Sequence, residues 1–252
     1  MSTDQSYEDT AQFYDGAYGD SSLARGDEAF YENLAIESGG PVLELGCGTG
    51  RALLPIASQG IDCSGIDLSP AMLEQFRQKR KASTVRLSCA SMDAFDLGER
   101  RFKLIFSAFR AFQHLDTVEQ QLACLSSVRA HLEPCGVFAF DVFNPRLERM
   151  AVDAEPELLD TSFTNERNEV KRYVSVTRHR VKQLIYVTFR YVEESATGPV
   201  KETKVNFTMR WFWRYELEHL LSRAGFTDVA IYGDFDRSPV GPDSSDLIVV
   251  AR

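Results

Sequence analysis

The sequence has little tryptophan, few histidines, no long apolar run and a deficit of basic residues. Its 252 residues include 2 Trp and 4 His, and 28 Lys and Arg stand against 37 Asp and Glu, for a net charge of −9. This deficit disfavours nucleic acid as a partner, because phosphate binding depends on clustered Lys and Arg. No stretch of the sequence approaches the roughly 18 apolar residues that a membrane span requires. We therefore expect a cytoplasmic protein that binds neither nucleic acid nor membrane.

Cysteine and histidine are present without a pattern that would indicate a metal or disulfide site. The 5 cysteines form no C-x-x-C pair, and the 4 histidines show no metal-ligand spacing. Hydrophobic residues make up 44% and charged residues 26% of the chain, which excludes a disordered chain and a disulfide scaffold. We expect reduced thiols, no metal site and one domain.

Short strands and helices alternate along the first part of the chain. The pattern predicts strands over 42–45, 61–66, 85–88, 102–107 and 137–143, with helices over 23–38, 51–58, 70–79 and 118–132. A helix over 215–223 and strands over 227–232 and 246–251 follow near the C-terminus. Such alternation predicts an α/β fold, a Rossmann-like and mostly parallel seven-stranded sheet with a reversed last strand and helices on both faces.

The middle of the chain breaks this rhythm. Three runs with period-2 alternation begin near Val174, Ile185 and Val205, with turn signals at 182–183 and 197–199. We expect an antiparallel three-stranded β insert that caps the core. The single domain then divides into an N-terminal helical lid, a core and a cap, at residues 1–40, 41–145 with 212–252, and 146–211.

A glycine-rich loop follows the first core strand, where Glu44 to Gly50 read E-L-G-C-G-T-G. At a strand-to-helix turn, backbone N–H groups can surround a ligand, and glycine lets the ligand approach closely. A dinucleotide fingerprint would require glycine where Arg51 stands, which disfavours an NAD-dependent oxidoreductase. Asp67 ends the next strand about 20 residues after the glycines, where a carboxylate accepts ribose hydroxyls.

Together these segments resemble the class I S-adenosylmethionine-dependent methyltransferases. The resemblance is close over 41–143 and implies S-adenosyl-L-methionine as cofactor and S-adenosyl-L-homocysteine as product. It assigns the cofactor contacts to Glu44, Gly46, Cys47, Gly48, Gly50, Asp67, Leu68, Ser91, Met92 and Ser107. Ser91 replaces the acid that the family commonly has for the adenine amino group, and Asp93 is displaced from that position by two. The sequence leaves the choice between these two residues open.

Two residues are candidates for the chemistry of methyl transfer. His114 follows the fourth strand at the carboxyl edge of the sheet, where its imidazole can act as a general base. A structural role in capping the next helix is the alternative. Tyr14 lies in an aromatic stretch that resembles the lid of small-molecule methyltransferases, where a ring face favours a sulfonium. Packing against a helix is the alternative for this residue.

The charge of the insert bears on the acceptor. Residues 161–210 contain ten Lys and Arg against five Glu, which indicates an anionic small-molecule acceptor. A solvated strand face explains the same count. Arg110, Arg190 and Arg210 are the candidate substrate contacts.

The insert and the lid are also similar to those of amino-sugar and glycine N-methyltransferases. We expect methyl transfer to a nitrogen of a small molecule, by a monomer or homodimer. An RNA or protein methyltransferase and a non-catalytic S-adenosylmethionine-binding protein are the alternatives.

Overall fold

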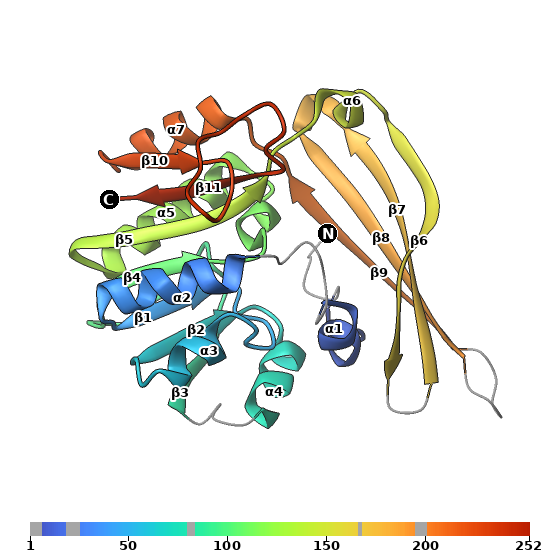
Figure 1. Cartoon of the computed structure of the whole chain (residues 1–252), viewed down its shortest axis with the longest axis horizontal. Coiled ribbons are helices and arrows are strands. Elements are labelled where there is room, and N and C mark those ends of the chain that lie inside the picture. The colour runs from blue at the N-terminus through green and yellow to red at the C-terminus, as the bar shows by residue number, and fades with distance from the viewer. Residues whose placement is uncertain (1–6, 19–25, 80–83, 166–167, 195–200) are drawn as a thin grey trace.

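Two separate β-sheets organise the chain (Figure 1). The computed structural model describes residues 7–18, 26–79, 84–165, 168–194 and 201–252. A seven-stranded sheet flanked by helices forms the core, and a four-stranded antiparallel sheet faces it as the cap. Among the described residues, no helix is both long and apolar enough to cross a membrane.

The core sheet has the strand order β10-β11-β5-β4-β1-β2-β3. Its strands are β1 (Val42–Leu45), β2 (Cys63–Asp67), β3 (Val85–Cys89), β4 (Phe102–Ser107), β5 (Leu132–Phe143), β10 (Val229–Tyr232) and β11 (Asp246–Ala251). Strand β11 runs antiparallel to both of its neighbours, whereas β1 to β5 pair in parallel. The predicted seven-stranded sheet with a reversed last strand is therefore confirmed. Its parallel strands end at one edge, which is where such sheets place their ligands.

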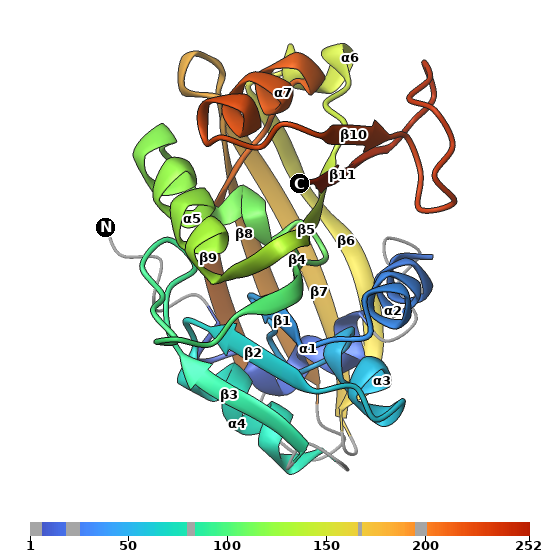
Figure 2. The same cartoon turned by 90° about the vertical axis from the view of Figure 1, so that its left-hand side faces the viewer.

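Helices cover both faces of this sheet (Figure 2). They are α2 (Asp27–Ser38), α3 (Leu53–Ser58), α4 (Pro70–Gln78), α5 (Val118–His131) and α7 (Arg214–Arg223). Apolar residues of α5 and α7 pack on one face of the sheet, and those of α2, α3 and α4 pack on the other. The predicted start of the helix over 23–38 lies outside the described residues. Helix α4 begins at Pro70, as predicted, and the Oγ of its N-cap residue Ser69 accepts the N–H of Met72 at 3.2 Å.

The cap has four strands, so the prediction of a three-stranded insert is wrong. The strands are β6 (Ala154–Asn165), β7 (Asn168–His179), β8 (Leu184–Glu194) and β9 (Lys201–Arg210), in that spatial order. The short helix α6 (Leu147–Met150) precedes them, and a 3-10 turn, η5 (Arg180–Lys182), joins β7 to β8. The predicted turn at 197–199 lies outside the described residues.

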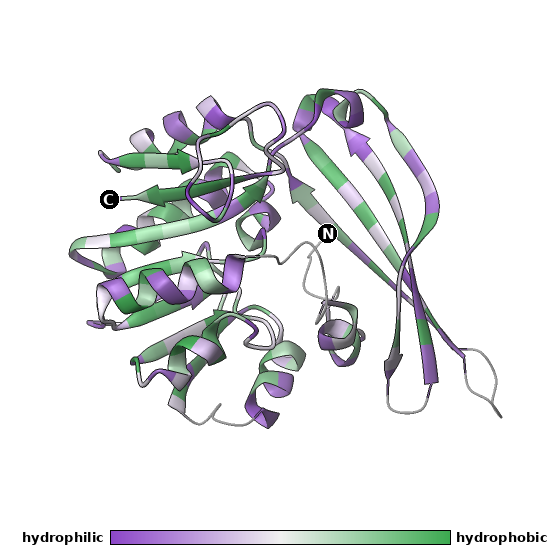
Figure 3. Ribbon diagram, in the orientation of Figure 1, coloured by the Kyte–Doolittle hydropathy of each residue, from purple (hydrophilic) through white to green (hydrophobic). Residues whose placement is uncertain are grey.

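Strand β6 escaped prediction because it lacks regular alternation. It forms an edge of the cap sheet and carries Pro156, which only an edge or a bulge tolerates. Its register against β7 shifts between Glu155 and Leu158, and again between Leu159 and Thr161. Each shift reverses the phase of the side chains, so no period-2 pattern survives along the strand. Along the other cap strands, β7, β8 and β9, apolar and polar bands alternate (Figure 3).

Helix α1 (Ala11–Tyr18) lies between the core and the cap (Figure 1). On the cap side, the ring of Phe13 stacks on that of Tyr191, with centroids 5.1 Å apart. On the core side, the carboxylate of Asp15 accepts the Thr49 hydroxyl at 2.6 Å and pairs with Lys79 at 2.7 Å. The helix thus joins the two sheets beside the glycine-rich loop.

Candidate functional site

A cavity of about 400 Å³ lies between the carboxyl edge of the core sheet and the inner face of the cap. The core contributes the glycine-rich loop after β1 and the ends of β2, β3 and β4, and the N-terminal segment contributes helix α1. The cap contributes side chains from β6, β7, β8 and β9. The cavity is therefore shared by all three parts of the chain.

The glycine-rich loop is held in shape by Asp67. Gly46 and Gly48 line the cavity with φ angles of 72° and 51°, which side-chain-bearing residues rarely adopt. The Asp67 carboxylate accepts the N–H of Gly48 at 2.7 Å and that of Ser69 at 2.8 Å. Burial raises the pKa of Asp67, and these two hydrogen bonds oppose that rise. Cys47 and Leu68 line the same part of the cavity.

Glu44 supplies a buried acceptor atom that the described protein groups leave unsatisfied. The residue is 3% exposed and lines the cavity. Its Oε2 has no hydrogen-bond partner among the described residues. Burial raises the pKa of this carboxyl well above its usual value. A cationic ligand group at this point would satisfy Oε2 and favour the ionised form, so the site fits the ammonium of S-adenosylmethionine.

Ser91 and Met92 line the cavity after β3, whereas Asp93 does not. The Ser91 hydroxyl donates to the carboxylate of Asp93 behind it. Among the described residues, it is thus Ser91 that the fold brings to the cavity, with Asp93 orienting its hydroxyl. The adenine contact of either residue stays a prediction.

Two of the predicted cofactor residues do not line the cavity. Gly50 packs against Phe76, and a Cβ on Gly50 would lie 2.6 Å from a ring atom of that residue. Ser107 is fully buried and donates its hydroxyl to the carbonyl of Leu45 at 3.2 Å. In the structure, Gly50 allows close packing of α4, and Ser107 connects β4 to β1.

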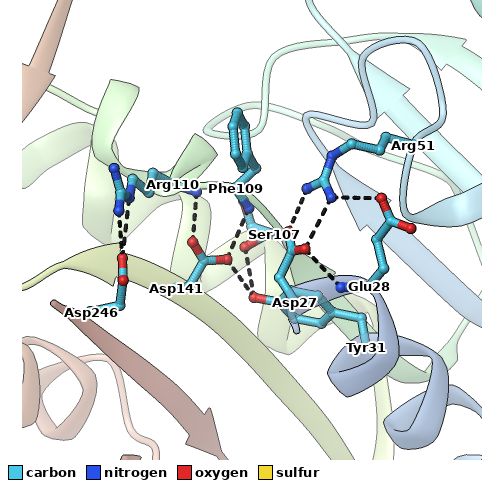
Figure 4. A network of polar contacts seen from close by, with 9 residues as sticks. All are labelled: Asp27, Glu28, Tyr31, Arg51, Ser107, Phe109, Arg110, Asp141 and Asp246. Atoms are coloured by element: carbon cyan, nitrogen blue, oxygen red, sulfur yellow. Dashed lines mark hydrogen bonds and ion pairs between the residues drawn. The ribbon is translucent and has the colours of Figure 1, made fainter. Parts of the chain in front are cut away.

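A network of polar contacts fixes the loop that follows β4 (Figure 4). Phe109 and Arg110 have φ angles of 55° and 65°, and both N–H groups donate to the carboxylate of Asp141 at 2.9 Å. The Tyr31 hydroxyl donates to the same carboxylate at 2.7 Å. Arg51 pairs with Asp27 and lies over the Phe109 ring, 4.8 Å from its centroid. The side chains of Phe109 and Arg110 are thereby held at the cavity wall.

His114 lies at the end of the short 3-10 helix η4 (Ala111–His114), and it lines the cavity. Its Nδ1 lies 3.1 Å from the carbonyl oxygen of Thr208, on cap strand β9. Because a carbonyl only accepts, Nδ1 carries the proton, and Nε2 of the neutral ring then keeps its lone pair. Burial lowers the pKa of His114. The imidazole is therefore set up to accept a proton at neutral pH.

Tyr14 projects from α1 into the cavity, next to Tyr18, with ring centroids 4.8 Å apart. Burial raises the pKa of Tyr14. The charges of Asp67 and Glu44 raise this pKa further, whereas the charge of Arg51 opposes the rise. The phenol thus stays protonated close to the glycine-rich loop. Tyr14 thus lines the cavity, and both the lid over the sulfonium and the catalytic role of Tyr14 remain predictions.

The three arginines predicted to bind substrate are already engaged by acids. Arg110 lines the cavity but pairs with Asp246 at 2.7 Å. Arg190 pairs with Glu157 at 2.7 Å and with Glu202 at 3.3 Å, outside the cavity lining. Arg210, which also lies outside the lining, pairs with Glu216 at 3.1 Å. The structure thus brings only Arg110 to the site.

Arg172 and Asp160 line the cap end of the cavity, and neither of them was predicted from the sequence as a site residue. The sequence held a signal for Arg172, because it is in phase with Val174 and Val176 on the inward face of β7. Arg190 and Arg210 are out of phase with their apolar stripes. An arginine within an apolar stripe was the better indicator of the site. The described residues contain no cluster of His, Cys, Asp and Glu that could hold a metal ion.

Comparison with known proteins finds a methyltransferase domain and similar folds. Residues 42–136 match a family model described as a methyltransferase domain. The structure of the CcbJ methyltransferase from Streptomyces caelestis superposes with a TM-score of 0.78 at 24% identity, covering 99% of this chain and 97% of that one. S-adenosylmethionine-bound CalS10, an amino pentose methyltransferase from Micromonospora echinaspora, gives 0.70 at 25% identity, covering 94% and 93%.

A curated relative matches half of the chain. It is the dTDP-3-amino-3,4,6-trideoxy-alpha-D-glucopyranose N,N-dimethyltransferase of Streptomyces venezuelae, 32% identical over 125 residues. The match covers 50% of this chain and 52% of that enzyme, so it spans about half the length of each. Residues 42–136 thus form a methyltransferase domain, and the fold of the whole chain is that of the class I S-adenosylmethionine-dependent methyltransferases.

Proposed function

We propose that the protein transfers a methyl group from S-adenosyl-L-methionine to a nitrogen of a small molecule. The observation that carries this proposal is the cavity itself, which runs from the glycine-rich loop to the inner face of the cap with His114 on its wall. A cavity formed by core loops, helix α1 and the cap suits a small acceptor better than RNA or a folded protein. The similarity to the N,N-dimethyltransferase of Streptomyces venezuelae supports nitrogen as the methylated atom.

The residues of the core end bind and orient the cofactor in this proposal. Glu44 accepts the ammonium of the methionine part, because its buried Oε2 otherwise has no partner among the described residues. Asp67 accepts ribose hydroxyls while it holds the glycine-rich loop through Gly48. Leu68, Ser91 and Met92 line the adenine part of the cavity. When bound, the cofactor supplies a methyl group activated by an adjacent sulfonium.

His114 and Tyr14 act on the acceptor side. An amine attacks only when neutral, so a base that removes its proton favours the reaction. The Nε2 lone pair of His114 is available for that proton because Nδ1 donates to Thr208. Tyr14 and Tyr18 cover the site with aromatic rings and exclude water, which suits a displacement at a cationic centre.

An anionic acceptor has little support from the structure. Strand β6 and the residue before it bring four acids that precede the basic segment 161–210. Asp153, Glu155, Glu157 and Asp160 pair with Arg180, Arg178, Arg190 and Arg172, respectively. These cations are neutralised by neighbouring acids. We therefore propose an acceptor that is uncharged around the amine that receives the methyl group.

The proposed function is tested with purified protein and methyl-labelled S-adenosylmethionine. Separate reactions contain an extract's metabolite, RNA and protein fractions, and mass analysis identifies the labelled product. We expect label in a metabolite that carries a new N-methyl group. Label in RNA or protein alone, or no binding of S-adenosylhomocysteine in calorimetry, would contradict the proposal.

A further inference from the structure

The cap end of the cavity contains one ion pair, between Asp160 on β6 and Arg172 on β7. The Nε and Nη2 atoms of Arg172 lie 2.6 Å and 2.5 Å from the carboxylate of Asp160. Both of these contacts fall on Oδ2. Among the described residues, Oδ1 of Asp160 therefore remains available to another donor.

The fold places this pair at the cavity by a local irregularity. Leu159 pairs with Tyr173 and Thr161 pairs with Arg172, so Asp160 is the extra residue of a β-bulge. A bulge turns one side chain away from the regular alternation and is common beside active sites. Here it directs the carboxylate of an edge strand toward an arginine on the inward face of the sheet.

Arg172 is held rigidly, which makes the pair a fixed feature of the wall. The residue is 3% exposed. Its guanidinium lies over the ring of Tyr18 and over the ring of Phe189, 4.4 Å from each centroid. Tyr18 belongs to the lid and Phe189 to the cap, so the arginine connects the two parts around the acceptor end.

Around this pair the wall is apolar. Val174, Val176 and Val187 line the cavity beside Phe189 and Phe207. The Asp160–Arg172 pair has no net charge, so it does not select a charged group. It offers a carboxylate oxygen to a donor beside these apolar side chains. A hydroxyl on a ring with apolar faces combines these two properties.

We propose that Asp160, fixed by Arg172, is a specificity-determining residue that accepts a hydrogen bond from a hydroxyl of the acceptor. This inference rests on the proposed function, since it names the part of the acceptor that lies opposite the transferred methyl group. It predicts a hydroxylated, uncharged ring on the acceptor amine.

The test measures binding to protein loaded with S-adenosylhomocysteine, by calorimetry. The probes are glucosamine, cyclohexylamine, which lacks hydroxyls, and glucosamine 6-phosphate, which adds an anion. We expect glucosamine to bind most tightly. Asp160→Asn is expected to weaken glucosamine binding roughly tenfold, the effect of losing a hydrogen bond to a charged acceptor. It should leave cyclohexylamine and S-adenosylhomocysteine binding unchanged.

Asp160→Asn leaves Arg172 buried without its counter-ion, so a second variant guards against misfolding. Asp160→Asn combined with Arg172→Met removes both charges. The matched control combines Glu157→Gln with Arg190→Met, which removes an ion pair between the same sheet's β6 and β8 outside the cavity lining. We expect the control to bind glucosamine as the wild type does.

The outcomes separate the two proposals. Failure of the wild type to bind S-adenosylhomocysteine would contradict the proposed function. Normal binding of S-adenosylhomocysteine with no preference for glucosamine over cyclohexylamine overturns the hydroxyl subsite alone. An equal loss in the control variant, or tighter binding of glucosamine 6-phosphate than of glucosamine, also overturns it.

Discussion

The carboxylate of Asp141, on strand β5, accepts the backbone N–H of Phe109 at 2.9 Å, on the loop that follows the neighbouring strand β4. Phe109 and the next residue, Arg110, both adopt left-handed backbone conformations that are unfavourable for their side chains. Asp141 compensates for this strain because it binds both N–H groups. A buried acid that does not line the cavity thus determines the shape of one cavity wall.

Asp141→Asn is expected to change how stability depends on pH. Burial raises the pKa of Asp141 from its usual 3.8 to about 6. Between these two pKa values the native protein keeps a proton that the unfolded chain releases. The stability of the wild type therefore falls relative to that of the variant as the pH rises from about 4 to about 6. A pKa difference of this size corresponds to roughly 3 kcal/mol. Urea unfolding of both proteins across this range measures the effect, and a pH-independent difference would contradict it.

Asp67→Ala is expected to reduce cofactor affinity. The change removes the acceptor of the Gly48 and Ser69 N–H groups as well as the proposed ribose contact. We expect S-adenosylhomocysteine to bind roughly ten- to a hundredfold more weakly in calorimetry. The control is Asp62→Ala, just before the same strand, which removes exposed ion pairs with Arg86 and Arg100. The proposed role is wrong if both variants bind the cofactor as the wild type does.

His114→Gln is expected to lower kcat while the fold is kept, because the glutamine amide can still donate to Thr208. The loss expected for a general base is roughly 10²- to 10⁴-fold. The base must be neutral, and burial lowers its pKa, so wild-type kcat/KM should decline only at pH values below the ordinary histidine pKa. In the variant this acidic decline should disappear. His219→Gln, at an exposed position on α7, is the control. An unchanged kcat in His114→Gln would exclude the catalytic role.

Gly50→Ala and Gly60→Ala form a matched pair that separates backbone strain from steric overlap. Their φ angles are nearly equal, at 85° and 82°. A Cβ at Gly50 would lie 2.6 Å from the Phe76 ring, whereas one at Gly60 has no heavy atom within 4 Å. We expect Gly60→Ala to destabilise the fold by about 1–2 kcal/mol through strain alone. Gly50→Ala should cost about 1–3 kcal/mol more. Equal losses in thermal unfolding would contradict this assignment.

The sequence was sufficient for the core and for the loops that end at the cavity, whereas the predicted cofactor contacts stay a prediction. The glycine-rich loop and Asp67 lie at the ends of adjacent buried strands, β1 and β2, so local patterns determine their positions. Ser107 shows the limit of such reasoning. It occupies the end of β4 as expected, but its side chain points to the carbonyl of Leu45 and not to the cavity. The direction of a side chain at a strand end depends on contacts that the sequence does not display.

The cap was predicted less well, for a physical reason. Two bulges and Pro156 remove the alternation of β6, so the strand could not be recognised. Because β6 was missed, its acids were left out of the charge count, and the insert was expected to be basic. The pairs Arg178–Glu155 and Arg190–Glu157 show that these acids neutralise the neighbouring strands.

The irregularity of β6 has a consequence for the behaviour of the protein at high concentration. A regular edge strand offers a row of backbone groups to which another chain can add a strand, and exposed Leu158 and Leu159 would favour such an addition. The two bulges and Pro156 interrupt that row. The same distortion that aims Asp160 at the cavity thereby protects the cap from edge-to-edge aggregation.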